Sequence, residues 1–586
     1  MAHAAGAEHE APPRRRVVRD PVHDYVEVPG ELAALVGSPA VQRLRGVSQN
    51  GMASVRYPAL TGSRYEHALG VMHLAAAGWQ SAWRTCDEDV RARFAREIIG
   101  ELRAAPEHDA CTARWLSGTE VEDTALWHDF PRVVGLVVAA VGLLHDLGHP
   151  PYSHVLEDFY QARIAQVMGT TAAREQAEYA AATGHGQFHE WAGLQIFDAL
   201  PDDCFSHLPR LFVRLVLSDR EGNDWAHCLH GIIDGQFDVD RLDYLMRDGL
   251  RAGTELGSID SRRLVESLEL HELPDGWRIG LGARAISAFE TMLVQRAQHY
   301  RWIIHHHAAV AADTALTRCA EGIFDLATAP PEGAADPALA DLRAALPDLD
   351  YVAAAVDSAP AGQCRDDADL LAWFRASRRP LKALAQSDVV PLAEPARRLL
   401  RLLDICDNVV LEPIPAWRNY QEFLARAEQN PDPVAALVDS APAPRTPDYL
   451  SSDATREAAR ILLTDLPARL NNALDHVFAG VDRREVERRL TADWPRIDGC
   501  GEGFWLISRV NFLAVREEFA TVWRGHEEAL LSAVSPFPFA LTAIEVMRPR
   551  YHVFFVPYGP VPRAPEKEER RAIGRAFLET VAALRT

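Results

Sequence analysis

The segment 141–154 of this sequence gathers side chains that suit metal-dependent chemistry. An apolar run ends in a His145-Asp146 pair, a Gly/Pro turn follows, and His149 and His154 lie within nine residues of the first histidine. An isolated His-Asp pair is most simply a hydrogen-bonded pair of the core. Three imidazoles and a carboxylate beside one turn are costly to bury unless something binds them. A bound metal ion would compensate that cost.

A second segment, residues 63–71, adds a cation and another imidazole. Arg64, His67 and Val71 recur at i, i+3 and i+7, so a helix would present all three on one face. This spacing makes His67 a further candidate metal ligand.

A third segment, residues 237–248, also has polar residues at helical spacing. Asp240, Tyr244 and Arg247 share a face, and Arg241 and Asp248 flank it. Such a charged stripe, taken alone, is more typical of a solvated helix surface. These charged residues indicate a functional site only when they are considered together with the other two segments.

These segments lie within long amphipathic patterns that predict the helices positioning them. The patterns cover residues 64–77, 133–146, 189–200, 237–250 and 285–320. We therefore predict a mainly α fold with a helical core over residues 17–320. Residues 1–16 are rich in Ala, Pro, Arg and His without apolar periodicity, which predicts a disordered leader.

The composition changes after the core. Between about residues 327 and 361 Ala, Pro and Asp predominate, which indicates a loose linker within a helical extension over residues 321–450. A second Pro-rich break at 431–447 precedes the final lobe, residues 451–586, where the β-branched and aromatic run 551–556 predicts a strand. We expect this C-terminal lobe to be α+β.

Bulk properties exclude several classes of protein. The 586 residues carry a formal net charge of −22, which argues against general binding to nucleic-acid phosphates. The eight cysteines lack a CxxC pair and are expected to be reduced and mostly buried. The longest apolar run is about a dozen residues, short of the roughly 20 that a membrane-spanning helix requires. Since no secretory signal pattern is visible, we expect a cytoplasmic protein.

The order of the motifs resembles a known family. The matching segments are residues 19–24 (Arg-Asp-Pro-Val-His-Asp), 42–45, 64–67, 145–154, 189–190 and 238–244. Together they are similar to the deoxynucleoside triphosphate (dNTP) triphosphohydrolases of the HD superfamily, over roughly residues 17–320. This resemblance implies an HD-domain helical core, and we expect a homo-oligomer.

The resemblance also implies a metal centre. It assigns the ligands of one divalent metal to His67, His145, Asp146 and Asp240. Imidazole and carboxylate ligands suit Mn, Fe, Zn, Ni or Co, and Mg²⁺ is a further candidate to accompany the triphosphate. Four protein ligands would leave positions for water and a phosphate oxygen, as in a catalytic site.

Further roles follow from the same resemblance. Residues expected to handle protons are His149, His154, His189 and Glu190. Residues that the resemblance expects to bind the substrate are Gln49, Asn50, Arg64, Arg241, Tyr244, Asp248 and Arg296, and the histidine triplet discussed below adds His306. The arginines would hold the triphosphate. Tyr244 would exclude a ribose 2′-hydroxyl, and Asp248 would accept the 3′-hydroxyl.

A regulatory nucleotide site is a separate hypothesis. Gln42 and Arg45 match part of an activator site found in some family members, and Gly37-Ser38-Pro39 stands where those members have an acidic residue. A nucleotide activator is therefore expected to bind without clear guanine selectivity.

The leading hypothesis is metal-dependent hydrolysis of dNTPs to deoxynucleoside and inorganic triphosphate. One alternative is an HD-type phosphodiesterase or nucleotidase that acts on another nucleotide or oligonucleotide. The other is a catalytically quiet scaffold that senses nucleotides, because a fold does not guarantee an activity.

Two further motifs do not change this interpretation. Residues 279–285 contain two glycines of a dinucleotide-binding fingerprint but no parallel βαβ pattern, so we expect a hairpin or a strand-to-helix turn. His305, His306 and His307 are adjacent, and on a helix they would point about 100° apart and could not chelate one ion together. We expect His306 to face the substrate cleft.

Overall fold

The structure is a computed structural model of the chain. It describes residues 14–117, 124–183, 187–218, 224–357, 362–407, 413–442, 465–498, 500–510, 521–524, 527–530, 548–559 and 567–584. Residues 1–13 of the expected leader, and residues 443–464 around the start of the expected C-terminal lobe, lie outside these ranges.

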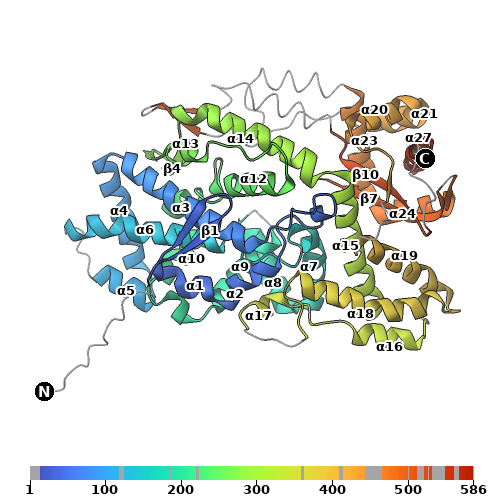
Figure 1. Ribbon diagram of the computed structural model, residues 1–586, viewed down its shortest axis with the longest axis horizontal. Helices are drawn as coiled ribbons and strands as arrows, with labels where there is room; N and C mark the ends of the chain where they lie inside the picture. The colour runs from blue at the N-terminus through green and yellow to red at the C-terminus, as the bar shows by residue number, and fades with distance from the viewer. Residues whose placement is uncertain are drawn as a thin grey trace.

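The fold is mainly helical with a mixed α+β part near the C-terminus, as predicted (Figure 1). The first elements are β1 (Arg16–Asp20), β2 (Asp24–Val28), α1 (Ala33–Gly37), α2 (Pro39–Arg43), α3 (Arg64–Thr85), α4 (Glu88–Ala104), α5 (Ala110–Ser117), α6 (Thr124–Leu144), α7 (His154–Val167), α8 (Thr170–Thr183) and α9 (Phe188–Ala199). They are followed by α10 (Arg210–Ser218), α11 (Asp224–His230), α12 (Val239–Ala252), α13 (Ser261–Val265), β3 (Leu268–Leu273), β4 (Gly276–Gly282), α14 (Ile286–His299) and α15 (His307–Thr328).

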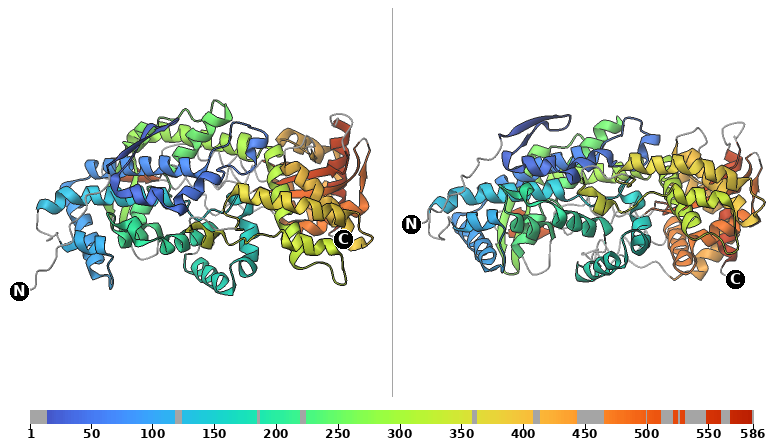
Figure 2. Two further views of the ribbon diagram at one scale, coloured as in Figure 1. Left: turned by 60° about the horizontal axis from the view of Figure 1, so that its bottom comes forward. Right: turned by 90° about the horizontal axis from the view of Figure 1, so that it is seen from below.

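The C-terminal half begins with α16 (Pro337–Ala344), α17 (Tyr351–Ala355), α18 (Asp367–Ala385), α19 (Val390–Cys406), β5 (Ile414–Pro415), α20 (Tyr420–Gln429) and α21 (Pro431–Ser440). It continues with α23 (Leu466–Gly480), α24 (Arg483–Asp493), β6 (Arg496–Ile497), β7 (Gly501–Arg509), β8 (Thr521–Arg524), β9 (Glu527–Leu530), β10 (Tyr551–Pro557) and α27 (Lys567–Ala583). The molecule is elongated, with the N-terminal helices at one end and the C-terminal lobe at the other (Figure 2).

Helices α3 and α6 pack together at the centre of the core. On α6, Val134, Val137, Val138 and Val141 are fully buried at the spacing of one helical face. Helix α3 starts with a capping box in which Ser63 and Glu66 satisfy each other's backbone groups. Because both helices are held tightly by apolar packing, the polar residues at their ends occupy fixed positions.

The strands form three small sheets among the described residues. One pairs β1 with β2, and another has the order β5-β10-β7-β6. The third, β3-β4-β8-β9, joins distant parts of the chain, because β8 runs parallel to β4 with Leu281 opposite Val522. Trp523 of β8 is buried and stacks on His271 at 3.7 Å. Strands β8 and β9 thus reach back from the C-terminal lobe onto the core.

The structure corrects three expectations about the described residues between 285 and 442. The pattern 285–320 is not one helix, because a π-helical turn over Tyr300–Ile304 separates α14 from α15. The described part of the segment 327–361, residues 327–357, is not a loose linker, since it contains α16 and α17 and the Tyr351 ring is fully buried. Pro431 begins helix α21 rather than a break, as proline is tolerated in the first turn of a helix.

Other expectations are confirmed. The run 551–556 lies in strand β10, and the Gly-containing segment 279–285 is the end of β4 leading into α14. All eight cysteines are free, and seven of them are buried. Within the described residues, no helix combines the length and the apolar character needed to span a membrane.

Candidate metal centre and active-site cleft

A cavity of about 860 Å³ opens in the helical core and collects most of the predicted site residues. Its walls include Gln49, Asn50, Arg64, His145, Asp146, His149, His154, His189, Glu190, Asp240, Arg241, Tyr244, Asp248 and Arg296. Residues from α3, α6, α7, α9, α12 and α14 therefore meet at one place although the sequence separates them widely.

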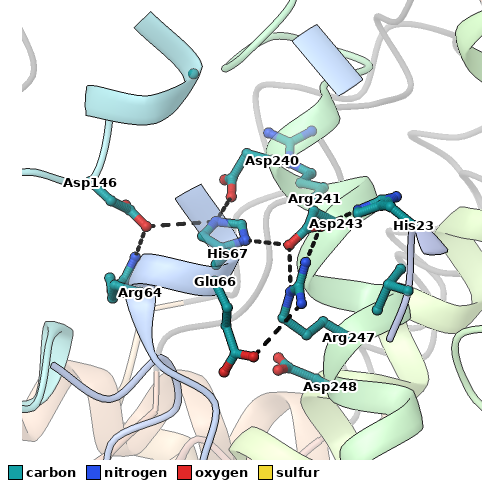
Figure 3. Close-up of polar contacts among 12 residues, drawn as sticks. His23, Arg64, Glu66, His67, Asp146, Asp240, Arg241, Asp243, Arg247 and Asp248 are labelled. Carbon is teal, nitrogen blue, oxygen red and sulfur yellow. Dashed lines mark hydrogen bonds and ion pairs between the residues drawn. The ribbon is translucent and has the colours of Figure 1, made fainter. Parts of the chain in front are cut away.

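Three predicted ligands, His67, His145 and Asp240, converge at the inner side of this cleft, and Figure 3 shows His67 and Asp240 facing each other. Nε2 of His67 lies 2.8 Å from Oδ1 of Asp240, and Nε2 of His145 lies 3.7 Å from the same oxygen. One ligand atom of each residue lies within 4.8 Å of the others. His67 comes from α3, His145 follows the last turn of α6, and Asp240 comes from the first turn of α12. This spacing could hold one metal ion.

The hydrogen bonds of the two histidines fit metal ligation. Nδ1 of His67 donates to Oδ2 of Asp243 at 2.7 Å, and Nδ1 of His145 donates to the carbonyl of Gly142 at 2.8 Å. Nε2 of each is buried and, despite its closeness to Asp240, makes no aligned hydrogen bond within the described residues. Metal-bound histidines characteristically donate their second ring N–H to a carboxylate or a carbonyl. Buried polar atoms without a partner are costly, and a cation between them removes that cost.

Asp146 stands beside this group. Its Oδ2 lies 3.6 Å from Nε2 of His67, and its Oδ1 lies 3.4 Å from Nε2 of His145. Burial would raise the pKa of Asp146, but the Arg64 guanidinium and the neighbouring histidines hold it well below its usual range. Asp146 is therefore an anionic carboxylate at the place where the resemblance requires a fourth ligand.

The electrostatics of the group favour a cation. Burial lowers the pKa of His67, but the carboxylates of Asp240 and Asp243 outweigh it and raise the pKa to about 10. Burial raises the pKa of Asp240, but its contacts with His145 and His67 outweigh it and lower this pKa below its usual value. Positive charge is thus stabilised here, and a metal ion would displace the proton from His67 on binding.

The turn after Asp146 is shaped by close backbone contacts. A Cβ atom at Gly148 would lie 2.0 Å from the carbonyl oxygen of His189, so only glycine allows α9 to approach the turn. Tyr152 and Ser153 have positive φ angles of 57° and 54°, a strained conformation for residues other than glycine. The Tyr351 hydroxyl donates to the carbonyl of Gly148 at 2.6 Å. A residue of the segment that was expected to be a linker therefore stabilises this turn.

A second polar group faces the same cleft and contains three predicted histidines. The rings of His149 and His189 stack at 4.1 Å, and the ring of His154 meets them edge-on at 4.6 and 5.3 Å. Glu157 accepts hydrogen bonds from Nδ1 of His154, at 2.7 Å, and from Nδ1 of His189. These four residues also lie close enough to hold a cation.

The charges in this group differ from one histidine to the next. Burial and the Arg64 guanidinium place the pKa of His149 well below its usual value, so this ring is neutral near neutral pH. Burial raises the pKa of Glu157, but its two histidine partners lower it far more, so Glu157 stays ionised. Glu190 also lines the cleft, within 3.4 Å of the Tyr179 hydroxyl.

The predicted phosphate-binding arginines occupy two walls of the cleft. Arg64 is 4% exposed and donates to Asp146 and to Oγ of Ser153, at 2.6 and 2.8 Å. Arg241 is more accessible, and its Nε lies 3.2 Å from Asp238. The cleft therefore offers cationic groups beside the candidate metal ligands.

The predicted sugar-binding residues form another connected group. Oδ1 of Asp248 accepts from Asn50 at 2.8 Å, and its Oδ2 accepts from Nε2 of His299 at 3.0 Å. The ring of Tyr244 lies 5.4 Å from that of His299. Asp248 thus already has two donors, so a sugar hydroxyl would share or replace one of them.

Three predicted residues lie away from this cleft. His306 caps the start of α15 and meets Tyr57, whereas His305 lines the cavity. The physical reason is the π-helical turn, which rotates the three histidines relative to one continuous helix. Gln42 and Arg45 contact each other at 2.8 Å, and Arg45 lines a separate cavity of about 330 Å³.

Several residues of the site were not assigned a role from the sequence. Asp243 supports His67, and Glu157 joins two histidines of the second group. Both follow helical spacings, since Asp243 is three residues after Asp240 and Glu157 three after His154. His299 and His305 had no such signal.

Comparison with known proteins gives a partial match. No protein-family profile matches the chain. It is 27% identical over 303 residues to the uncharacterized protein MJ1154 of Methanocaldococcus jannaschii, covering 52% of this chain and 49% of that protein. It is 22% identical over 321 residues to the human deoxynucleoside triphosphate triphosphohydrolase SAMHD1, covering 52% of this chain and 44% of SAMHD1. The chain thus spans about half the length of the curated relatives it matches.

A solved structure gives a wider alignment. A phosphohydrolase from Bacteroides thetaiotaomicron aligns with 92% of this chain and 99% of its own, at 17% identity and a TM-score of 0.48. The sequence matches agree with the resemblance of the motifs: over about half of its length, the chain is similar to HD-superfamily dNTP triphosphohydrolases.

Proposed function

We propose that the protein hydrolyses deoxynucleoside triphosphates to deoxynucleoside and inorganic triphosphate in a metal-dependent reaction. The observation that carries the proposal is the joining of two groups in one cleft. The candidate metal ligands His145 and Asp240 line it together with the cations Arg64 and Arg241, and His67 lies buried directly behind them. The similarity to SAMHD1 supports the choice of substrate.

The arginines account for binding of a long phosphate chain. A guanidinium can donate two parallel hydrogen bonds to phosphate oxygens. Arg64 is already oriented by Asp146 and Ser153, so little side-chain entropy is lost when a phosphate binds. Arg241 approaches from α12, on another wall of the cleft. Negative charge that develops on the phosphate is thereby stabilised by groups fixed in advance.

A bound metal would activate water and phosphate, and the histidines would transfer protons. A divalent ion held by His67, His145, Asp146 and Asp240 would polarise a phosphate oxygen and lower the pKa of water. Glu157 holds the Nδ1 protons of His154 and His189, which leaves Nε2 as the atom that gives or takes a proton at the leaving group.

The residues near Tyr244 account for selection of the sugar. The Tyr244 ring packs near His299, and Asp248 presents carboxylate oxygens beside Asn50. We propose that the ring occupies the space a ribose 2′-hydroxyl would need, and that Asp248 accepts the 3′-hydroxyl.

A substrate panel tests this proposal. Purified protein is incubated with each of the four dNTPs, alone and mixed, in the presence of Mn²⁺, Fe²⁺ or Co²⁺, and the products are identified by chromatography. We expect inorganic triphosphate from the wild type, none from Asp240→Asn, and wild-type release from Asp275→Asn, which changes an exposed carboxylate outside the cleft.

Two results would contradict the proposal. One is the absence of triphosphate under every combination of metal and nucleotide. The other is cleavage of phosphodiesters or nucleoside monophosphates while dNTPs stay intact, which would favour a phosphodiesterase or nucleotidase.

A further inference from the structure

The turn between β1 and β2 contacts Asp243, the carboxylate that holds the candidate metal ligand His67. Nε2 of His23, in that turn, donates to Oδ1 of Asp243 at 2.6 Å (Figure 3). The side chains of the two residues are 6% and 0% exposed, although 220 residues separate them in the sequence. A residue of the N-terminal hairpin thus contacts the carboxylate that orients His67.

Both oxygens of Asp243 are fully used. Oδ1 accepts from His23 and from Nη2 of Arg247, and Oδ2 accepts from His67 and from Nε of Arg247. Because each oxygen has two donors, Asp243 cannot rotate without breaking several buried hydrogen bonds. The contact of His23 with Oδ1 of Asp243 therefore helps to fix Oδ2 of Asp243, and Oδ2 in turn fixes the His67 ring.

The turn itself is fixed by a second carboxylate. Oδ1 of Asp20 accepts from the backbone N–H of Val22, at 2.8 Å, and of His23, at 2.9 Å. Its Oδ2 accepts from Nη1 of Arg247 at 2.9 Å. Arg247 therefore links the two carboxylates and aligns the hairpin turn with α12.

Close packing leaves this network little freedom. A Cβ atom at Gly70 of α3 would lie 1.9 Å from Oδ1 of Asp243. Only glycine at this position lets α12 approach α3 closely enough for Asp243 to meet His67. The contact is thus built into the packing of the two helices and is sensitive to small displacements.

The hairpin depends on these contacts. Strand β1 exposes four of its five residues, and Val17 and Tyr25 are 54% and 58% exposed. A two-stranded sheet is at best marginally stable in water by itself. Val26 and Val28 of β2 do pack on the core, and His23 and Asp20 supply the buried polar contacts of the turn.

We propose that the β1–β2 hairpin is a positioning element for the metal centre: His23 holds Asp243, Asp243 orients His67, and docking of the hairpin is thereby coupled to retention of the metal. This inference rests on the proposed metal site. Coupling of two binding equilibria is reciprocal, so metal should stabilise the docked hairpin to the same extent that the hairpin strengthens metal binding.

The test measures Mn²⁺ affinity of the full-length protein and hydrogen exchange of residues 16–28, with and without Mn²⁺. Removing a partner that contacts a ligand directly typically weakens metal binding by about 10- to 100-fold. His23 lies one contact farther out, so we expect His23→Ala to raise the Mn²⁺ dissociation constant by roughly 3- to 10-fold.

Two matched variants separate positioning from general damage. His23→Gln keeps a donor at the place of Nε2 and should restore the dissociation constant to within about 2-fold of the wild type. Val17→Ser changes an exposed residue of the same hairpin and should leave it unchanged. Mn²⁺ should slow exchange of the hairpin amides in the wild type and in His23→Gln, but not in His23→Ala.

The outcomes distinguish this inference from the proposed function. If the wild type binds Mn²⁺ and a folded His23→Ala binds it equally well, or if Val17→Ser is weakened as much, the coupling is wrong and the metal site stands. If the wild type binds no metal, both the coupling and the proposed metal-dependent function are wrong. If metal and hairpin are coupled but no dNTP is hydrolysed, only the proposed reaction falls. Should His23→Ala not fold, Asp20→Asn loosens the same turn and gives the same comparison.

Discussion

Arg64 donates from Nη1 to Oδ2 of Asp146 over 2.6 Å, although the two residues lie 82 positions apart in the sequence. Both side chains are buried, and Nε of the same guanidinium holds Oγ of Ser153. The arginine expected to bind phosphate therefore also orients an expected metal ligand and the strained turn before α7.

This double role predicts that Arg64→Lys damages the metal site as well as substrate binding. A lysine ammonium cannot reproduce the planar fork that reaches Asp146 and Ser153 together. We expect metal affinity to fall by about 10- to 100-fold and triphosphate release to fall at least as much. Metal content and product formation measure the two effects. Arg84→Lys, at the exposed end of α3, should change neither. Wild-type metal binding in Arg64→Lys would show that the contact with Asp146 has no such role.

The hydrogen bonds of Glu157 predict a different phenotype. Glu157→Gln keeps the size of the side chain but removes the charge that holds the Nδ1 protons of His154 and His189. We expect kcat to fall by about 100-fold or more, which is the usual effect of disturbing general acid–base catalysis. Metal content should be unchanged because Glu157 does not contact the group around His67. A loss of metal together with activity would instead show that the second histidine group holds a metal itself. Glu178→Gln, on the exposed face of α8, is the control.

The place of Tyr244 predicts the basis of sugar discrimination. Truncation in Tyr244→Ala opens the space beside His299, so ribonucleoside triphosphates should enter the cleft. We expect the ratio of kcat/KM for dNTPs over ribonucleoside triphosphates to fall by about 10-fold or more. Tyr244→Phe keeps the ring and should preserve the ratio. An unchanged ratio in Tyr244→Ala would assign discrimination to another residue.

Asp313 predicts a pH-dependent contribution to stability. It lies on α15 at the wall of the cleft and accepts from the backbone N–H of Met52 at 2.8 Å. Burial raises its pKa from 3.8 to about 7, although the hydrogen bond from Met52 opposes this. Between about pH 4 and pH 7 the folded protein therefore holds a proton that the unfolded chain has lost, and this residue's contribution to stability decreases as the pH rises through that window.

Asp313→Asn removes this dependence. At pH 8 we expect the variant to melt about 1–3 °C above the wild type, and at pH 3.5 the two should coincide because both side chains are neutral. Thermal unfolding across the pH range measures the difference. Asp341→Asn, on the exposed face of α16, is the comparison. A variant less stable than the wild type at pH 8 would contradict the sign.

The helices of the core could be predicted because apolar periodicity is a local signal. The patterns around Arg64, Asp146 and Asp240 predicted helices α3, α6 and α12, with α12 within two residues of its observed bounds, α3 ending eight residues too early and α6 beginning nine residues too late. The strand over 551–556 was predicted from its β-branched and aromatic composition, which is also a local signal. The pairing of β8 with β4 was not, because it is a parallel contact between residues more than 200 positions apart and depends on tertiary packing.

The candidate site was predictable where its residues form motifs. His67, His145, Asp146 and Asp240 stand in recognisable short segments, and the structure brings them together. The contribution of Tyr351 was not predictable, because the Ala- and Pro-rich composition around it indicates a linker while its own hydroxyl meets Gly148. The position of His305 depends on a π-helical turn that leaves no trace in the periodicity.

Hydrolysis in water enriched in a heavy isotope of oxygen, followed by mass spectrometry of the products, tests the central claim most directly. If the cleft binds a dNTP with its phosphate chain between Arg64 and Arg241 and directs water to the α-phosphorus, the heavy oxygen should appear in inorganic triphosphate and none should appear in the deoxynucleoside. Heavy oxygen in the deoxynucleoside, or release of a nucleoside monophosphate with pyrophosphate, would contradict the account.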